Sequence, residues 1–226
     1  MNNINKSIKL NYKFSPQNKE ELISIINKQI KNFGDNVNLN DIDISSVTSL
    51  SYLFYNSKFT GDISKWNVSN VTNMVSMFSH SKFNGNISEW DVSNVTTMQS
   101  MFYSSNFTGN ISNWDVNNVK ETQLMFAYSK FNGNISEWNM SNVIDAKYMF
   151  YESKFNQNVS NWDISNIKSM VSMFYNSNYT KNLSNWFNKL NKNCNLISFG
   201  TFNKHKINSY EDFKQYHREM ILKKLS

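Results

Sequence analysis

A tryptophan recurs every 24 residues through most of this 226-residue chain, and no other feature constrains its fold as strongly. An earlier partial copy of the repeat is in the same register and carries Ile42 in place of tryptophan. The six tryptophans are Trp66, Trp90, Trp114, Trp138, Trp162 and Trp186. A fixed period in this range is typical of a solenoid, in which each repeat forms one coil and stacked coils share a core.

The repeat that begins at Trp66 predicts the shape of one coil. Trp66 and Val68 are two residues apart, which predicts that they face the same side of a short strand. Apolar residues between positions 71 and 78 recur at intervals of three or four, which predicts a short helix. Phe83 then returns an aromatic ring to the core, and we expect Gly85 to make the next corner with a positive φ. The predicted fold class is an α/β repeat, a β/α solenoid of about six coils.

Two polar columns recur with the same period, and we expect both to be structural. The asparagines just after the strand are expected to form a buried column of amides that bond neighbouring coils. They are Asn70, Asn94, Asn118, Asn142 and Asn166. The serines before the returning aromatic are expected to satisfy the backbone of a turn. They are Ser57, Ser81, Ser105, Ser129, Ser153 and Ser177.

Helices are predicted at both ends of the repeats. Ser15 and Pro16 read as the start of an amphipathic helix that ends at Gly34, and Ser209 reads as the N-cap of a second helix. A stack of coils exposes its core at each end, so we expect these helices to act as caps. The expected divisions are a polar segment and capping helix at 1–36, solenoid repeats at 37–190, and an irregular coil with a capping helix at 191–226.

The string W-[ND]-V-S-N-V-T-x-M-x-x-M-F, followed by F-N-x-[ND]-I-S, resembles the repeat of BspA-type bacterial surface proteins. The resemblance covers residues 41–187. It implies a right-handed, leucine-rich-repeat-like β/α solenoid and a role in binding proteins or surfaces, often in adhesion. It brings no catalytic residues with it.

Groups that could carry chemistry are few and scattered. Cys194 is the single cysteine, and we expect a packed thiol there. His80, His205 and His217 share no ligand spacing with each other or with Cys194. We therefore expect no enzyme, no metal site and no cofactor.

The residues directly before and after each tryptophan should point away from the core, because the tryptophan between them is buried. They form a strip with seven acids and one lysine, called the acidic strip below. Its members are Asp41, Asp43, Lys65, Asn67, Glu89, Asp91, Asn113, Asp115, Glu137, Asn139, Asn161 and Asp163. The strip is interpreted as a recognition surface for a basic protein or, with equal weight, as a solubilising face; a divalent cation ranks well below both. Reversing Asp91, Asp115 and Asp163 to lysine is expected to abolish partner binding without changing stability.

A second hypothesis comes from the charge distribution. Residues 1–33 carry a net charge of +4 and residues 181–226 carry +6, whereas residues 34–180 carry −4. Nucleic acid or an anionic surface could therefore bind through the basic terminal regions, with a patch at the C-terminal end. That patch would contain Lys204, Lys206, Lys214, Arg218, Lys223 and Lys224. Nucleic acid ranks below a protein partner, because charge alone is weak support and the chain has one arginine.

A column of tyrosines after the predicted helix is a third candidate surface. Tyr55, Tyr103, Tyr151 and Tyr175 share one register, which Ser79 and Ala127 interrupt. Half-buried packing is the favoured interpretation over a binding role.

No apolar run is long enough to span a membrane, and no signal peptide or lipidation site is found. We expect a monomer that stays in the cytoplasm, although the BspA-type proteins that it resembles are often surface-exposed.

Overall fold

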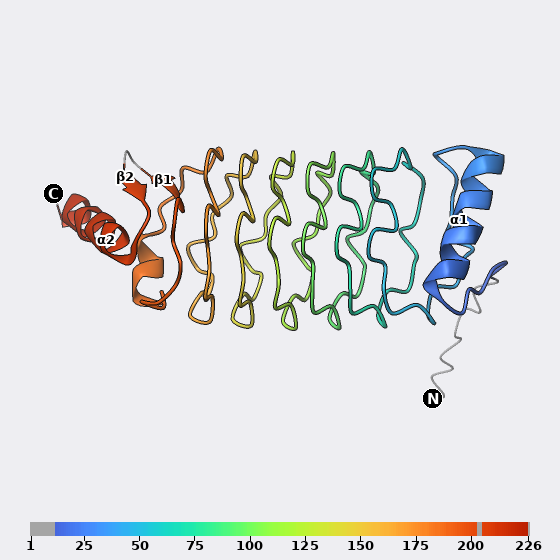
Figure 1. Cartoon of the computed structure of the whole chain (residues 1–226), viewed down its shortest axis with the longest axis horizontal. Coiled ribbons are helices and arrows are strands. Elements are labelled where there is room, and N and C mark those ends of the chain that lie inside the picture. The colour runs from blue at the N-terminus through green and yellow to red at the C-terminus, as the bar shows by residue number, and fades with distance from the viewer. Residues whose placement is uncertain (1–11, 203–204, 226) are drawn as a thin grey trace, which may run out of the picture.

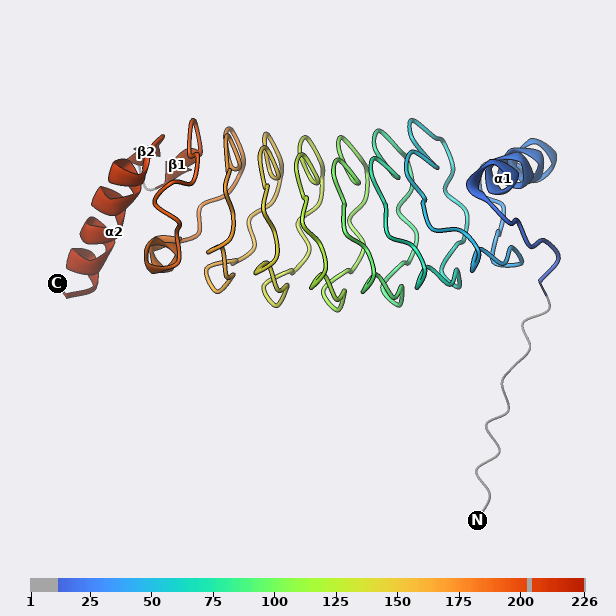
Figure 2. The same cartoon turned by 60° about the horizontal axis from the view of Figure 1, so that its bottom comes forward.

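The computed structural model describes residues 12–202 and 205–225, which form a row of stacked coils between two helices. The α-helices are α1 (Lys19–Phe33) and α2 (Tyr210–Leu225), and a 3-10 helix, η1, spans Ser184–Asn188. Two short strands, β1 (Gly200–Phe202) and β2 (His205–Ile207), pair antiparallel next to α2. Figures 1 and 2 show the coils side by side in two views, with α1 at one end and α2 at the other.

The backbone of each coil is hydrogen-bonded to the next coil along one side, called the ladder side below. The N–H of Phe54 donates to the carbonyl of Met77 at 2.9 Å, and Phe78 donates in the same way to Met101. The coils also meet through isolated parallel bridges on this side. The bridged residues are Ser49, Asn73, Thr97, Glu121, Asp145, Ser169 and Asn195.

The prediction of a short helix in each coil is wrong. In the described chain, no helix lies between α1 and η1. The segment is a series of turns instead: Met77 N–H bonds to Met74 carbonyl, Ser79 N–H to Ser76 carbonyl, and Ser76 and His80 have φ values of 53° and 57°. These positive φ values are incompatible with a right-handed helix, and they turn alternate N–H groups toward the neighbouring coil. Turns and helix place apolar side chains at similar intervals, so the spacing alone did not distinguish them.

The strand expected at each tryptophan is also absent. Trp66 and Val68 are both buried, as predicted, but they lie between two turns, closed by Trp66 N–H to Ile63 carbonyl and Val71 N–H to Val68 carbonyl. Around the tryptophan the inter-coil bonds come from side chains, those of Trp66 and Asn70, and backbone bonds between coils resume at Thr72, whose N–H donates to the carbonyl of Thr48 at 2.9 Å. The β/α alternation within each coil is therefore not found.

Tryptophan ties each coil to the one before it from within the core. The indole Nε1 of Trp114 donates to the carbonyl of Ile87 at 3.1 Å, and all six tryptophans make the equivalent bond at 2.9–3.2 Å. Two columns of phenylalanine rings stack beside them. Rings in the column of Phe54 lie 5.3–5.8 Å apart, and those in the column of Phe59 lie 6.0–6.5 Å apart. Phe54 also packs on Trp66, with ring centroids 6.0 Å apart. The aromatic core therefore lies between the ladder side and the tryptophan side.

The serine column has the structural role that was predicted. Each serine oxygen accepts the N–H two residues later, as Ser81 does from Phe83 at 3.1 Å. The asparagine column is only partly as expected. Asn118 Nδ2 donates to the carbonyl of Ser93 in the preceding coil at 2.7 Å, and its four counterparts do the same. These asparagines are exposed, not buried.

Gly85 does not have the positive φ that was predicted. Among the described glycines, only Gly34 has a positive φ. A Cβ on Gly85 would lie 2.8 Å from the ring of Phe83, so a larger residue at this corner requires the ring or the backbone to shift. Gln157 and Lys181 occupy the equivalent corners of later coils.

The end helices are attached by specific contacts. Helix α1 ends at Phe33 before Gly34, as predicted, but its N-cap is Asn18 and not Ser15: the Asn18 side chain accepts the N–H of Glu21. Leu22 and Ile26 are the buried residues of α1. The predicted N-cap of α2 is confirmed, because Ser209 Oγ accepts the N–H of Asp212.

Helix α2 is joined to the last coil by two of its side chains. The Tyr216 hydroxyl bonds to Asn182, and His217 Nδ1 donates to the carbonyl of Ser184. Residues 1–11, which belong to the predicted polar segment, lie outside the described residues. Over the described ranges, no helix is both long and apolar enough to cross a membrane.

Replacing Trp114 with Phe tests the buried indole bond. The substitution removes one of the two donors to the carbonyl of Ile87, which keeps only the Trp90 N–H, and it removes part of the stacked core. We expect the free energy of unfolding to fall by about 2–4 kcal/mol, measured by chemical denaturation. The matched control is Asp115→Asn, because asparagine serves at the equivalent positions 67 and 139. Equal stability of the Trp114→Phe protein and the wild type would contradict this role for the indole.

Candidate functional site

The residue after each tryptophan closes a turn, which gives half of the acidic strip a structural role. Each of these side chains accepts the N–H of the residue two positions later at 3.0–3.2 Å. They are Asp43, Asn67, Asp91, Asp115, Asn139 and Asp163. All except the half-buried Asp43 are exposed. The expectation that Asp91, Asp115 and Asp163 could be changed to lysine at no cost in stability is inconsistent with these bonds, since lysine cannot accept them.

These hydrogen bonds favour the charged form of the carboxylates. The hydroxyl and then the N–H of Ser93 lower the pKa of Asp91. The N–H and then the hydroxyl of Ser165 lower the pKa of Asp163. The strip therefore keeps these negative charges at any pH near neutrality.

The side chain of the residue before each tryptophan does not close a turn. Glu89 and Glu137 are exposed, and each accepts a hydrogen bond from the hydroxyl of the preceding serine. Lys65 and Glu89 line a polar hollow of about 410 Å³ together with Ser64, Trp66 and Asn86. This half of the strip has charges that the turns do not need.

Lysines occupy both ends of the acidic strip. Lys13 Nζ lies 3.0 Å from the carboxylate of Asp41. At the other end, Lys189 Nζ donates to the carbonyls of Asn161 and Trp162 at 2.9 and 3.1 Å, and its charge also lowers the pKa of Asp163. In the middle coils the acids have no such partner: within the described chain, no ion pair involves Glu89, Asp91, Asp115 or Glu137.

The tyrosine column is half-buried, as the favoured packing interpretation expected, at only two of its four positions. Tyr55 and Tyr175 are 50% and 37% exposed, while Tyr103 and Tyr151 are half-buried. They lie on the ladder side, away from the acidic strip.

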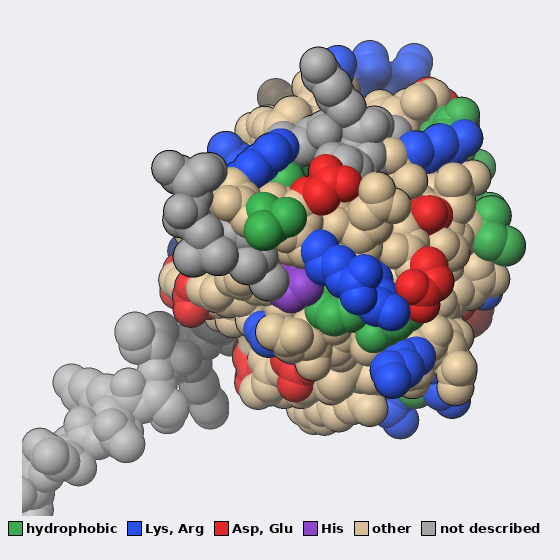
Figure 3. Space-filling model, turned by 90° about the vertical axis from the view of Figure 1, so that its left-hand side faces the viewer, with side chains coloured by type: hydrophobic (Ala, Val, Ile, Leu, Met, Phe, Trp, Pro, Cys, Tyr) green, Lys and Arg blue, Asp and Glu red, His purple; other side chains and the backbone are tan. Residues whose placement is uncertain are grey.

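The basic C-terminal patch is dispersed. Figure 3 shows lysine and arginine side chains spread over the end that carries α2, with acidic side chains among them. Arg218 and Lys206 are exposed, but Lys214 pairs with Glu211 at 3.3 Å. Lys204 and the side chain of Lys224 lie outside the described residues.

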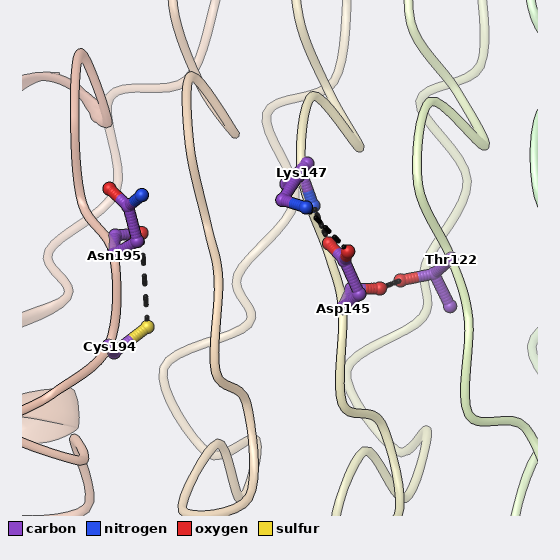
Figure 4. A network of polar contacts seen from close by, with 5 residues as sticks. All are labelled: Thr122, Asp145, Lys147, Cys194 and Asn195. Carbon is purple, nitrogen blue, oxygen red and sulfur yellow. Dashed lines mark hydrogen bonds and ion pairs between the residues drawn. The ribbon is translucent and has the colours of Figure 1, made fainter.

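Cys194 is buried near the last coil. Figure 4 shows its sulfur beside the Asn195 carbonyl, 4.0 Å away. Burial raises the pKa of the thiol to about 12, so a reactive thiolate is disfavoured at neutral pH. Across the described ranges, no three acidic, histidine or cysteine side chains are grouped to hold a metal ion. The side chain of His205 is outside those ranges.

Comparison with known families gives one match. A family model described as "Mycoplasma protein of unknown function, DUF285" matches residues 22–130 and again residues 104–210. The two matches cover most of the chain, and the chain belongs to this family. No curated protein and no solved structure matches it.

Acid titration should reveal the turn-closing carboxylates. The folded pKa values of Asp91 and Asp163 lie below the unfolded value of about 3.9, so their stabilisation is present above pH 4 and is lost as pH falls through the folded values. We expect an Asp91→Asn/Asp163→Asn variant to unfold within about 1 kcal/mol of the wild type at pH 7, because asparagine accepts the same bond.

Between pH 4 and pH 2 this variant should lose less stability than the wild type, as measured by urea midpoints. Identical pH profiles for the two proteins would show that these hydrogen bonds do not stabilise the charged form.

Proposed function

We propose that this protein is a non-enzymatic, monomeric binding scaffold whose acidic strip binds a basic segment of another protein. We also propose that its stack of coils is a right-handed, leucine-rich-repeat-like solenoid. The resemblance to BspA-type repeats supports both proposals, since those proteins bind proteins or surfaces, often in adhesion. The main support is the contact between the Lys189 ammonium group and two backbone carbonyls of the strip.

Lys189 illustrates how a basic partner would bind. Its ammonium group contacts two backbone carbonyls of the strip beside Asp163. Within the described chain, the equivalent carbonyls of Asn113 and Trp114 accept no hydrogen bond. They lie beside the unpaired carboxylate of Asp115. The middle coils thus offer lysine side chains the same combination of carbonyl acceptors and negative charge.

The spacing of the strip suits an extended partner. Neighbouring coils are about 4.8 Å apart, so residues two coils apart, such as Glu89 and Glu137, are separated by about 10 Å. Alternate side chains of an extended chain are nearly 7 Å apart. A segment with several lysines could therefore reach successive coils with modest side-chain adjustment, and binding would weaken as salt is added.

The test uses a fluorescent decalysine peptide at low ionic strength. Glu89→Gln/Glu137→Gln removes two strip charges that close no turn, and we expect the Kd to rise about fivefold or more. Glu121→Gln/Glu211→Gln is the matched control, because it removes two exposed glutamates away from the strip. Thermal unfolding confirms that both variants are folded. Equal losses in the two variants would show that net charge, not the strip, attracts the peptide.

A further inference from the structure

A row of exposed and half-buried aromatic rings runs along the ladder side and crosses six coils. Consecutive ring centroids are 5.1–5.9 Å apart, mostly in edge-to-face contact. The rings belong to Tyr55, His80, Tyr103, Tyr128, Tyr151 and Tyr175. Tyr128, which the tyrosine column predicted from the sequence did not include, is 44% exposed. Two adjacent registers thus combine into one continuous surface row.

The coils do not need these rings in order to fold. Ser79 and Ala127 occupy one of the two registers in other coils, and Asn56, Ser104 and Asn176 occupy the other. His80 and Tyr128 have φ values of 57° and 56°, a region that asparagine adopts more easily than a bulky residue. A ring at such a position makes the backbone less favourable, so its presence is better explained by contact with another molecule.

A column of lysines runs beside the aromatic row. It lies three residues further along each coil than the tyrosine column, and all of its side chains are exposed. In the described chain, none of these lysines is in an ion pair. They are Lys58, Lys82, Lys130 and Lys154, with Asn106 and Asn178 in the two remaining coils. Half of the eight lysines between residues 34 and 180 are therefore in one register.

The aromatic row also contains a hollow. Tyr103, Tyr128, Tyr148, Tyr151 and Leu124 line a space of about 280 Å³ whose walls are mainly apolar. Such a space takes a flat ring more readily than a charged group. The lysines of the same coils, at positions 130 and 154, follow two and three residues after the ring in each coil.

The acids of the repeats do not oppose a negatively charged ligand here. Most of them belong to the acidic strip on the tryptophan side, with the aromatic core between. On the ladder side, Lys147 and Asp145 form an ion pair at 3.0 Å (Figure 4). The exposed Glu121 and Glu152 also lie on this side, and Glu152 is hydrogen-bonded by Tyr151. With four unpaired lysines nearby, the tyrosine–lysine strip formed by the aromatic row and the lysine column is positive on balance.

We propose that the tyrosine–lysine strip binds single-stranded nucleic acid, with bases stacked on the tyrosine rings and phosphates near the lysines. A single strand supplies flat rings and regularly spaced negative charges together, and aromatic platforms beside basic residues are how proteins hold it without reading sequence. A duplex hides its base faces, so it binds less tightly. The proposal goes beyond the proposed function and involves the opposite side of the coils.

The experiment measures anisotropy of fluorescein-labelled dT20 between 20 and 200 mM NaCl. With four lysines at phosphates, the slope of log K against log salt is expected to be about −2.8. Lys130→Asn/Lys154→Asn, which copies Asn106 and Asn178, should reduce the slope to about −1.4. The matched control, Lys120→Thr/Lys168→Thr, copies the threonines at positions 48, 72 and 96 and should leave the slope unchanged.

The rings are tested by Tyr103→Ser/Tyr151→Ser, which copies Ser79 and should weaken dT20 binding about tenfold or more. Thermal unfolding checks that each variant is folded. Absence of dT20 binding overturns the proposal, as does an equal effect of the two lysine variants. The proposal is also overturned if polyglutamate binds as tightly as dT20 and the Tyr103→Ser/Tyr151→Ser change does not affect binding. That result would indicate an acidic polypeptide as the ligand. The Glu89→Gln/Glu137→Gln variant should bind dT20 like the wild type, which separates this result from the acidic strip.

Discussion

The hydrogen bond from one coil to the next is the constraint on which the rest of this structure depends. On the ladder side the bond joins backbone N–H and carbonyl groups, as between Phe54 and Met77. On the tryptophan side it joins side chains to carbonyls, as between Trp114 and Ile87 and between Asn118 and Ser93. An insertion within one repeat would shift these donors from their acceptors on both sides. The strict period of 24 residues follows from this requirement.

These structural roles determine which side chains are available to bind a ligand. Tryptophan, phenylalanine and methionine fill the core, and serine, asparagine and aspartate close the turns. What remains are the side chains that the coil does not require, such as Glu89 before a tryptophan or Tyr128 at a turn. They gather in two strips of opposite charge on opposite sides of the core. A scaffold of this kind can hold two different ligands without either competing for the other's surface.

The sequence predicts which side chains fill the core and close the turns better than it predicts the backbone conformation of the coil. The buried tryptophans, the serine turns and the C-terminal helix were predictable, because each depends on one side chain and its near neighbours. The predicted helix at Met74 and Met77 was wrong because consecutive turns bury residues at the same intervals; only the direction of the backbone N–H groups differs. Asp91 is both an exposed member of the acidic strip and the acceptor that closes a turn. The second role was missed because aspartate is common both at exposed positions and in turns. The lysine column was detectable, since Lys58, Lys82, Lys130 and Lys154 share one register, but counting charge along the chain concealed it.

The most direct test of this account is NMR detection of scalar couplings across hydrogen bonds in the isotope-labelled protein. The N–H of Phe102 donates to the carbonyl of Met125 in the next coil at 2.9 Å. The account predicts a coupling between the nitrogen of Phe102 and the carbonyl carbon of Met125. A coupling from Phe102 to the carbonyl carbon of Met98, four residues earlier, would mean a helix within the coil and would contradict it.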